Sequence, residues 1–277
     1  ALSMALDVYQ SVSNVGSAIT FNKVMAARKM LTDSLAPGSE RKLILNTQDN
    51  LDLVDSLKGL FQDSSTISQQ YRDGLVGKTA GFGDIYENTL LASQATGTAL
   101  ASTTYTVNGA SQVGSGVIVA TGATTFKKGD GITFAGCNRV HPETKADTGV
   151  LQQFVVTTDY AGGAGTIAIS PAIVTSTGRQ NVSASPTNGG AVTKIGGASA
   201  IYKPSLAFHK NAFTFATVDM EDVSQYGVWS ARESYDGISM RVARQYAIST
   251  DAIPCRIDVM YGYKTLRAEL AARILSN

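Results

Sequence analysis

The sequence predicts an α+β protein that is interrupted by a separate all-β domain. Residues 1–94 contain amphipathic helical segments, and residues 201–277 contain long alternating strands. Residues 95–200 are rich in Gly, Thr, Ser, Val and Ala, and their apolar residues alternate with small polar ones between glycine turns. Such a pattern is typical of a small antiparallel β domain. We therefore expect a discontinuous host, 1–94 and 201–277, with residues 95–200 inserted at an exposed loop.

The first part of the host is predicted to contain two helices and two strands. Residues 20–35 keep their apolar side chains to one broad face, which predicts a helix. A short apolar run at 43–45 predicts a buried strand, and Thr47 or Asp49 can then cap a second helix. The expected apolar stripe of that helix is Leu51, Val54, Leu57, Leu60 and Phe61. Residues 85–91 predict a strand that leads out of the host.

The inserted region is predicted to form six short strands joined by glycine turns. These strands are 104–107, 116–120, 131–135, 153–158, 166–170 and 192–195. Asn108-Gly109 is a hairpin signal. The turn at 127–130 directs Ile132 and Phe134 to one face of the next strand and Thr133 to the other. Residues 175–190 are mostly small and polar, which predicts a long surface loop.

The second part of the host is predicted to contain a long antiparallel ladder. Apolar residues alternate with polar ones over 238–242 and again over 255–259. We expect these segments to pair and to bury one common face in a core. The tail over 265–275 is compatible with a short helix or with a final extended segment.

Composition excludes several classes of function. Only 16% of the 277 residues are charged, and the formal net charge is +1. Low charge fits a protein that packs against copies of itself, whereas a dedicated nucleic-acid binder needs clustered Lys and Arg. The two cysteines, Cys137 and Cys255, have no disulfide or zinc spacing and are expected to be small buried residues. No run approaches the ~18 apolar residues of a membrane span, and no secretion signal is expected.

Two motifs resemble catalytic or binding sites only superficially. Gly77-Lys78-Thr79 lacks the glycine that a phosphate loop needs five residues earlier, where Arg72 stands, so a solvated loop is favoured. The acidic group Asp219, Glu221 and Asp222 has no calcium-loop spacing and is expected to be a solvated turn rather than an acid–base or cation site.

The two histidines are predicted to be structural. His141 lies in a polar loop, and His209 lies between two apolar runs, where a hydrogen-bonded turn or strand end is expected. Two isolated histidines cannot form a His-rich metal site. We expect no cofactor and no metal ion.

Arginines are concentrated in the last fifth of the chain. They are Arg232, Arg241, Arg244, Arg256, Arg267 and Arg273. One interpretation places them on solvated strand faces. The other places them in ion pairs between subunits, because the planar guanidinium pairs bidentately with carboxylates. The candidate carboxylates are Asp63, Asp73, Glu87 and Glu233.

Three segments resemble the major capsid proteins of tailed phages. They are "QQYRDGLVGKTAGFGDIYENTLL" (69–91), "TTFKKGDGITFAG" (124–136) and "SLAFHKNAFTFATVDM" (205–220). The group they resemble is the coat-protein family typified by the short-tailed Salmonella phage P-twenty-two. Within it, a Lys-x-Gly-Asp-x-Ile-x-Phe-Ala-Gly strand recurs in an inserted barrel, here within 124–136. The resemblance runs in the same order over most of the chain.

The resemblance implies a fold and a set of partners. The fold would be the HK97-like capsid fold, with axial and peripheral domains as the host and a β-barrel insertion domain as the middle run. It also implies that the chain begins near the end of the family's spine helix, and that the family's long charged loop after the first barrel strand is missing. The implied partners are copies of the chain, scaffolding protein, portal and packaged double-stranded DNA, without a membrane.

We therefore expect a structural, non-enzymatic coat subunit that forms an icosahedral shell of pentamers and hexamers. It would be located in the virion and assembled in the bacterial host cytoplasm. The expected subunit-contact residues are Arg72, Asp73, Arg232, Glu233, Arg241 and Arg256. One alternative is a β-rich adhesin-like binding module. The other is a hydrolase that uses His209 and the acidic group at Asp219.

Overall fold

The computed structural model describes residues 2–14, 16–57, 78–120, 122–176 and 178–276. These residues divide into two compact units, which we describe separately. The main unit consists of residues 2–212 and 266–276, and the hairpin unit consists of residues 213–265. Strands dominate both parts, helices are few, and the five-stranded sheet of the main unit is mixed, so the predicted α+β class is confirmed.

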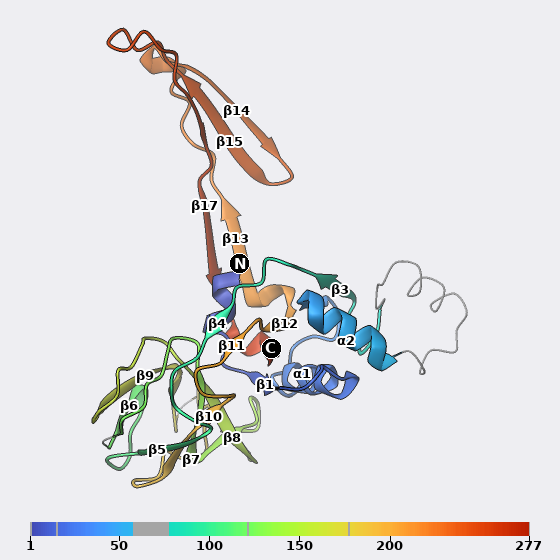
Figure 1. The fold of residues 1–277 in the computed structure, drawn as a ribbon, viewed down its shortest axis with the longest axis vertical. Coiled ribbons are helices and arrows are strands. Elements are labelled where there is room, and N and C mark those ends of the chain that lie inside the picture. The colour runs from blue at the N-terminus through green and yellow to red at the C-terminus, as the bar shows by residue number, and fades with distance from the viewer. Residues whose placement is uncertain (1, 15, 58–77, 121, 177, 277) are drawn as a thin grey trace. The chain divides into compact units, whose positions relative to one another are not determined.

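The main unit contains a five-stranded core sheet with two helices beside it (Figure 1). Its strand order is β1 (Ser11–Ser13), β18 (Ala271–Leu275), β12 (Ser205–His209), β2 (Arg41–Leu45) and β3 (Asp84–Glu87). The helices are α1 (Phe21–Asp33) and α2 (Thr47–Leu57). Short 3-10 turns are η1 (Leu2–Asp7), η2 (Lys210–Ala212) and η4 (Ala268–Leu270). The interior strand β18, between β1 and β12, is buried along its length.

The structure confirms most of the predicted host elements and corrects three details. The helix at 20–35 and the strand at 43–45 are present, and the tail contains both a 3-10 turn and a strand. The second helix is capped by neither Thr47 nor Asp49. The Asn46 side chain caps it instead, since its Oδ1 accepts the amide proton of Asp49 at 2.7 Å. The strand expected at 85–91 is shorter and ends at Glu87.

The apolar stripe expected on the second helix is partly wrong. Leu51 is 62% exposed, whereas Leu53 and Leu57 are buried together with Asp49. Asp49 can face inward because the hydroxyls of Ser205 and Ser276 both donate to its carboxylate. This polar pairing rotates the helix away from the face that hydrophobicity alone selects. Leu60 and Phe61 lie outside the described residues.

Residues 102–195 form a separate six-stranded sheet. Its order is β5 (Ser102–Thr106), β10 (Ala191–Ile195), β7 (Gly131–Val140), β8 (Asp147–Val156), β9 (Gly165–Ile173) and β6 (Gly114–Val119). The two end strands also meet, because Val107 and Val119 form a bridge and Ala120 N–H donates to Thr106 C=O at 2.8 Å. All six predicted strands are therefore present, although β7 and β8 are longer than predicted.

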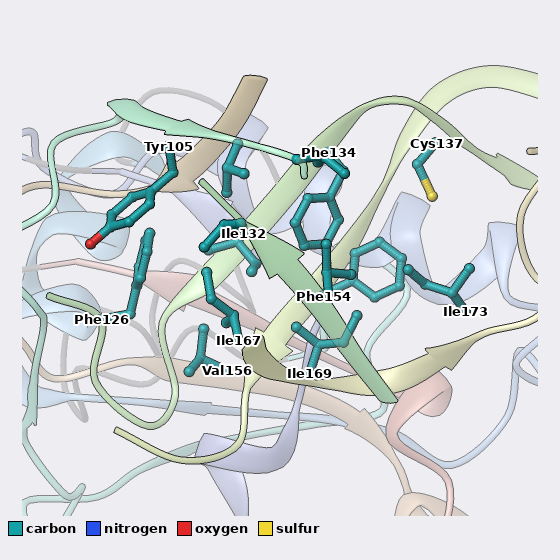
Figure 2. Close-up of a cluster of buried hydrophobic side chains, with 14 of the residues drawn as sticks. Tyr105, Phe126, Ile132, Phe134, Cys137, Phe154, Val156, Ile167, Ile169 and Ile173 are labelled. Atoms are coloured by element: carbon teal, nitrogen blue, oxygen red, sulfur yellow. The ribbon is translucent and has the colours of Figure 1, made fainter. Parts of the chain in front are cut away.

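Side chains from this six-stranded sheet pack into a common hydrophobic cluster (Figure 2). Phe134 and Phe154 lie with ring centroids 5.5 Å apart, and Ile132 is fully buried beside them. Cys137 belongs to the same cluster, as expected for a small apolar residue. The two ends of the region are joined by a short two-stranded sheet, which we call the neck. It pairs β4 (Gln94–Ala95) with β11 (Ile201–Tyr202). We call residues 95–200 the lobe.

The hairpin unit is built from two antiparallel sheets and a 3-10 turn. The first sheet pairs β13 (Phe213–Thr217) with β17 (Tyr261–Thr265). The second, which we call the outer sheet, has the order β14 (Trp229–Tyr235), β15 (Ile238–Arg244) and β16 (Cys255–Asp258). The turn η3 (Ser224–Tyr226) precedes β14. The predicted pairing of 238–242 with 255–259 is confirmed, because Val242 lies opposite Ile257.

The core face predicted for this ladder is wrong. In the outer sheet, directly opposed residues share a face, and one face carries the large apolar side chains. Ile257, Met240 and Ile238 are 67%, 43% and 41% exposed within the described residues. The alternation was read correctly, but the hairpin unit itself leaves the apolar face that it produces largely exposed. Cys255 lies in the same sheet and is likewise exposed rather than buried.

Candidate assembly surface

The outer sheet has two chemically different faces, and these define the candidate functional surface. The first face, which we call the apolar face, carries Trp229, Ala231, Glu233, Tyr235, Ile238, Met240, Val242, Arg244, Cys255 and Ile257. The second, the polar face, carries Ser230, Arg232, Ser234, Ser239, Arg241, Ala243, Arg256 and Asp258. This division follows from the two-residue period of a strand and from the register of the three strands.

The polar face is the one that the hairpin unit covers with its own chain. The Arg241 Nη1 donates to the carbonyl of Glu221 at 2.8 Å, and the hydroxyl of Ser230 donates to Asp222. Ser239, on the same face, is 4% exposed. Burying the polar side of a sheet while leaving the apolar side in water is unfavourable for an isolated subunit. The apolar face therefore has the properties of a surface that a protein partner covers.

Arginines on the polar face are neutralised inside the hairpin unit. Asp258 accepts a hydrogen bond from Arg241 Nη2 at 2.8 Å and forms an ion pair with Arg256, whose Nε lies 2.8 Å from its carboxylate. The hydrogen bond from Arg241 is the main reason that the pKa of Asp258 is lowered from 3.8. Arg232 Nη1 lies 3.4 Å from the carbonyl oxygen of Met220.

The apolar face contains few charges, and these lie among aromatic side chains. Arg244 stacks on the ring of Trp229, with its guanidinium carbon 4.3 Å from the ring centroid. Glu233 lies opposite Met240 on this face. Tyr235, at the end of β14, is 81% exposed. Such exposed aromatic residues with a few charges are typical of the central part of protein interfaces.

The first sheet of the hairpin unit also exposes aromatic side chains. Phe215 lies opposite Tyr263, and the rings of Phe215 and Tyr261 stack with centroids 6.0 Å apart. Phe215, Tyr261 and Tyr263 are 57%, 61% and 46% exposed. Both sheets of this unit therefore offer apolar surface to a partner.

The structure separates the residues that the sequence proposed as subunit contacts. Arg232, Arg241 and Arg256 lie on the polar face, whereas Glu233 lies on the apolar face. Arg72 and Asp73 lie outside the described residues, as does Gly77 of the phosphate-loop resemblance. The sequence missed the apolar contacts, above all Trp229, Tyr235 and Ile257. The alternation around Ile257 was assigned to a core, and no strand was predicted for β14, which carries Trp229 and Tyr235.

The remaining candidate sites are structural. His209 ends β12 at 2% exposure, and its Nδ1 accepts the amide proton of Asn211 at 3.2 Å, as predicted for a strand-end histidine. His141 lines a cleft of about 460 Å³ between α1 and β8, where its Nδ1 accepts amide protons from Glu143 and Thr144 at 3.3 Å. Both rings thus stabilise turns.

The acidic group is solvated, as predicted. Asp219, Glu221 and Asp222 are all exposed, and Glu221 accepts a hydrogen bond from Gln225 at 2.7 Å. Among the residues that the structure describes, no group of three or more His, Cys, Asp or Glu side chains is arranged to hold a metal ion. Within the same residues, no helix combines the length and apolar character needed to cross a membrane.

Arg273 is an exception to both interpretations of the arginines. It lies at the centre of β18 and is fully buried, so it is neither on a solvated face nor free to pair with another subunit. Its guanidinium donates to Gln94, Ser11 and Gly129 inside the main unit. Burial lowers its pKa to about 10. The sequence signal was an arginine in an otherwise apolar strand.

A mixed-sheet protein with an uncovered apolar face and only structural histidines fits the class of assembling structural proteins. Comparison with known proteins identifies that class. The model of the family described as "P22 coat protein - gene protein 5" matches residues 2–274. The chain belongs to this family, so the resemblance stated from the sequence is confirmed.

Similarity to individual proteins is low. One similar solved structure, described as Mycobacterium phage Che8, is 13% identical with a TM-score of 0.36. The match covers 99% of this chain and 55% of that one, so the chain spans about half the length of the matched protein. No curated protein matches the chain.

Proposed function

We propose that the chain is the major capsid protein subunit of a double-stranded DNA tailed phage and that it self-assembles into the pentamers and hexamers of an icosahedral shell. The exposed apolar face of the outer sheet is the observation that carries this proposal. Trp229, Tyr235 and Ile257 expose large apolar area that becomes favourable only when another protein surface covers it. In a shell, the abundant partner is a further copy of the same chain.

Assembly by this route depends on many modest contacts rather than on one strong contact. Each subunit of a closed symmetric shell meets several neighbours, and closure makes later contacts effectively intramolecular. The low charge of the chain supports the same function, because few charges have to be desolvated when subunits pack. No catalytic step is part of the proposal.

We propose the HK97-like capsid fold for the chain, with residues 1–94 and 201–277 as a discontinuous core domain and 95–200 as an inserted β-barrel. Two observations support the insertion. The lobe has its own hydrophobic cluster, and its two ends run side by side where Ala95 pairs with Ile201. The bridge between Val107 and Val119 supports a closed barrel, because it joins the end strands of the sheet.

The proposed partners beyond the chain itself are scaffolding protein, portal and packaged DNA. A net charge of +1 supports a wall that encloses DNA without binding it tightly, since tight binding requires clustered Lys and Arg. The virion is the proposed location, with assembly in the host cytoplasm. Subunit contacts are proposed to include Glu233 on the apolar face and Arg72, Asp73, Arg232, Arg241 and Arg256 elsewhere.

Electron microscopy tests this function directly. The chain is expressed with and without the scaffolding protein of its phage, and the products are separated by sedimentation and imaged. We expect shells or capsomers of uniform size with five-fold and six-fold symmetry. Dispersed monomers or amorphous aggregates at every concentration, with and without scaffold, would contradict the proposal.

A further inference from the structure

Buried polar side chains join the lobe to the rest of the main unit. Arg273, in the core strand β18, donates from Nη1 to Gln94 Oε1 at 3.0 Å. Its Nη2 donates to Ser11 Oγ at 3.1 Å and to the carbonyl of Gly129 at 3.0 Å. One guanidinium therefore connects the core strands, the neck and a lobe turn, which are far apart in the sequence.

A second polar contact lies at the β1 edge of the core sheet. Gln153, from lobe strand β8, accepts the amide proton of Ser11 at 2.6 Å and donates to the carbonyl of Ser11 at 3.1 Å. The side-chain amide thus bonds to both backbone groups of one residue in β1, as a neighbouring strand would. This contact shares Ser11 with Arg273, but it comes from a different lobe segment, β8 rather than the turn at Gly129.

The lobe side of the junction is itself held in place by buried charges. Lys194 donates from Nζ to the carbonyl groups of Gly97, Ala99 and Gly197 at 2.9–3.0 Å. Asp130 accepts amide protons from Gly97 and Lys127 at 3.0 Å. A side chain at Gly97 would place its Cβ 2.1 Å from the carbonyl oxygen of Thr125, so the chain after the neck passes very close to its neighbour.

The polar contacts restrict the orientation of the lobe more than the neck alone would. A two-stranded neck would tether the lobe but permit it to rotate, because only two residue pairs hold it. Directional hydrogen bonds in a low-dielectric interior select one geometry, since each misplacement leaves a buried polar group unpaired. Two separate contacts, at Arg273 and at Gln153, fix both the position and the rotation of the lobe.

We propose that the Arg273 and Gln153 contacts form an orientation lock, in which Arg273 is the positioning residue that holds the lobe in one fixed orientation on the core sheet. Every subunit then presents its lobe at the same angle. The inference rests on the proposed assignment of 95–200 as an inserted domain, and it goes beyond the coat function, which does not require a rigid lobe.

Nuclear magnetic relaxation of the full chain tests the lock. In the wild type, we expect equal rotational correlation times for amides of the lobe and of the core sheet. Arg273→Met keeps most of the side-chain volume but removes the three hydrogen bonds, so the lobe correlation time is expected to fall below that of the core. Arg273→Lys, which retains the charge but loses the planar fork, is expected to give an intermediate fall.

Arg41→Met is the matched control. Arg41 is also buried, but its guanidinium bonds only to Pro37, Ala36 and Thr32 near its own strand. This variant is expected to lower the midpoint of thermal unfolding while both correlation times stay equal. A fall in the lobe correlation time in Arg41→Met as well would indicate general loosening and would contradict a specific lock.

Gln153→Ala keeps the proposal testable if Arg273→Met does not fold. Gln153 is only partly buried, so its removal is tolerated more easily. We expect a smaller fall in the lobe correlation time, because Arg273 remains. Equal correlation times of lobe and core in every folded variant would overturn the lock. That result would leave the coat function standing, because shell formation is measured separately by electron microscopy.

Discussion

The lobe and the hairpin unit are both antiparallel β structures with alternating sequences. The lobe buries its apolar faces, whereas the hairpin unit exposes them. In the lobe, the end strands meet and Phe126, Phe134 and Phe154 are fully buried. In the hairpin unit, Trp229, Tyr235 and Ile257 are all more than half exposed. The lobe completes its own core, whereas the hairpin unit requires another surface to cover its apolar face.

The difference shows what alternation in a sequence does and does not specify. A two-residue period predicts that one face of a strand is apolar. It does not predict what covers that face. In the lobe, side chains from its own strands supply the cover. In the outer sheet the only cover within the unit lies over the polar face, where Arg241 bonds to the carbonyl of Glu221. Folding and assembly can therefore draw on the same sequence pattern.

The largest expected effect comes from a core substitution in the lobe. Phe134→Ala removes a ring that packs on Phe154 and leaves a cavity, so the free energy of unfolding should fall by about 3–5 kcal/mol. Tyr235→Ala, the matched change in the hairpin unit, should cost less than about 0.5 kcal/mol, because that ring is 81% exposed. Urea unfolding of the monomeric chain measures both.

Equal losses of unfolding free energy from these two substitutions would contradict the difference between the lobe and the hairpin unit. A large loss in Tyr235→Ala would mean that the apolar face of the outer sheet is already covered in the isolated subunit. A negligible loss in Phe134→Ala would mean that the lobe does not form the core seen in Figure 2.

The next effect concerns association rather than folding. Ile257→Asp places a carboxylate on the apolar face, in the edge strand β16, where burial against another subunit would leave it unpaired. We expect self-association to weaken at least about tenfold, which corresponds to about 1.4 kcal/mol. Sedimentation velocity over a range of concentrations measures the change.

Ser234→Asp supplies the control for this prediction. Ser234 is exposed on the polar face of the same sheet, and the change adds the same charge. It should leave association within about a factor of two. If both variants associate equally well, the apolar face is not part of a subunit interface.

Much of the main unit could be predicted from the sequence because periodicity and burial agree there. The helix at 20–35 matches α1, and all six lobe strands were placed near their observed positions. The side chains of Ile132 and Phe134 are buried and Thr133 is not, as the turn at 127–130 predicted. In these segments the buried apolar residues meet partners from the same region, so local patterns are sufficient.

The sequence could not predict features that depend on polar pairing over long distances. Asp49 faces inward because Ser205 and Ser276, more than 150 residues away, donate to it. Arg273 can be buried because Gln94 and Gly129 accept hydrogen bonds from its guanidinium. The exposure of the apolar face could not be predicted either, because it depends on the absence of a cover within the described chain.

The reactivity of the two cysteine thiols should also differ between the lobe and the hairpin unit. Cys255 lies on the exposed apolar face, whereas burial raises the pKa of Cys137 in the lobe to about 12. The nucleophile is the thiolate, and a rise from 9.0 to about 12 reduces its fraction roughly a thousandfold. A disulfide reagent at neutral pH should therefore label Cys255 in the folded monomer and Cys137 only on unfolding.

Assembly should protect Cys255, since it shares its face with Trp229 and Ile257. Mass spectrometry of labelled monomers and labelled particles distinguishes the two thiols. Labelling of Cys255 at equal rates in monomers and in particles would place this end of the apolar face outside the subunit interface.

The smallest expected effect is a pH dependence of opposite sign in the two regions. The hydrogen bond from Arg241 lowers the pKa of Asp258 below 3.8, so its contribution to stability is present above 3.8 and is lost as the pH falls through the lowered value. Burial raises the pKa of Cys137 from 9.0 to about 12, so its contribution is complete below 9.0 and is lost as the pH rises toward 12.

Acid should therefore weaken the hairpin unit, and alkali should weaken the lobe. Trp229 is the single tryptophan of the chain, so its fluorescence follows the hairpin unit, while amide resonances of β7 follow the lobe. Asp258→Asn should remove part of the acid dependence of the first signal, and Cys137→Ala should remove part of the alkaline dependence of the second. If both variants change the acid dependence, or both change the alkaline dependence, of the same signal, the two regions do not respond independently. The exposed hairpin unit would then be stabilised by the core of the lobe rather than by its own ion pairs.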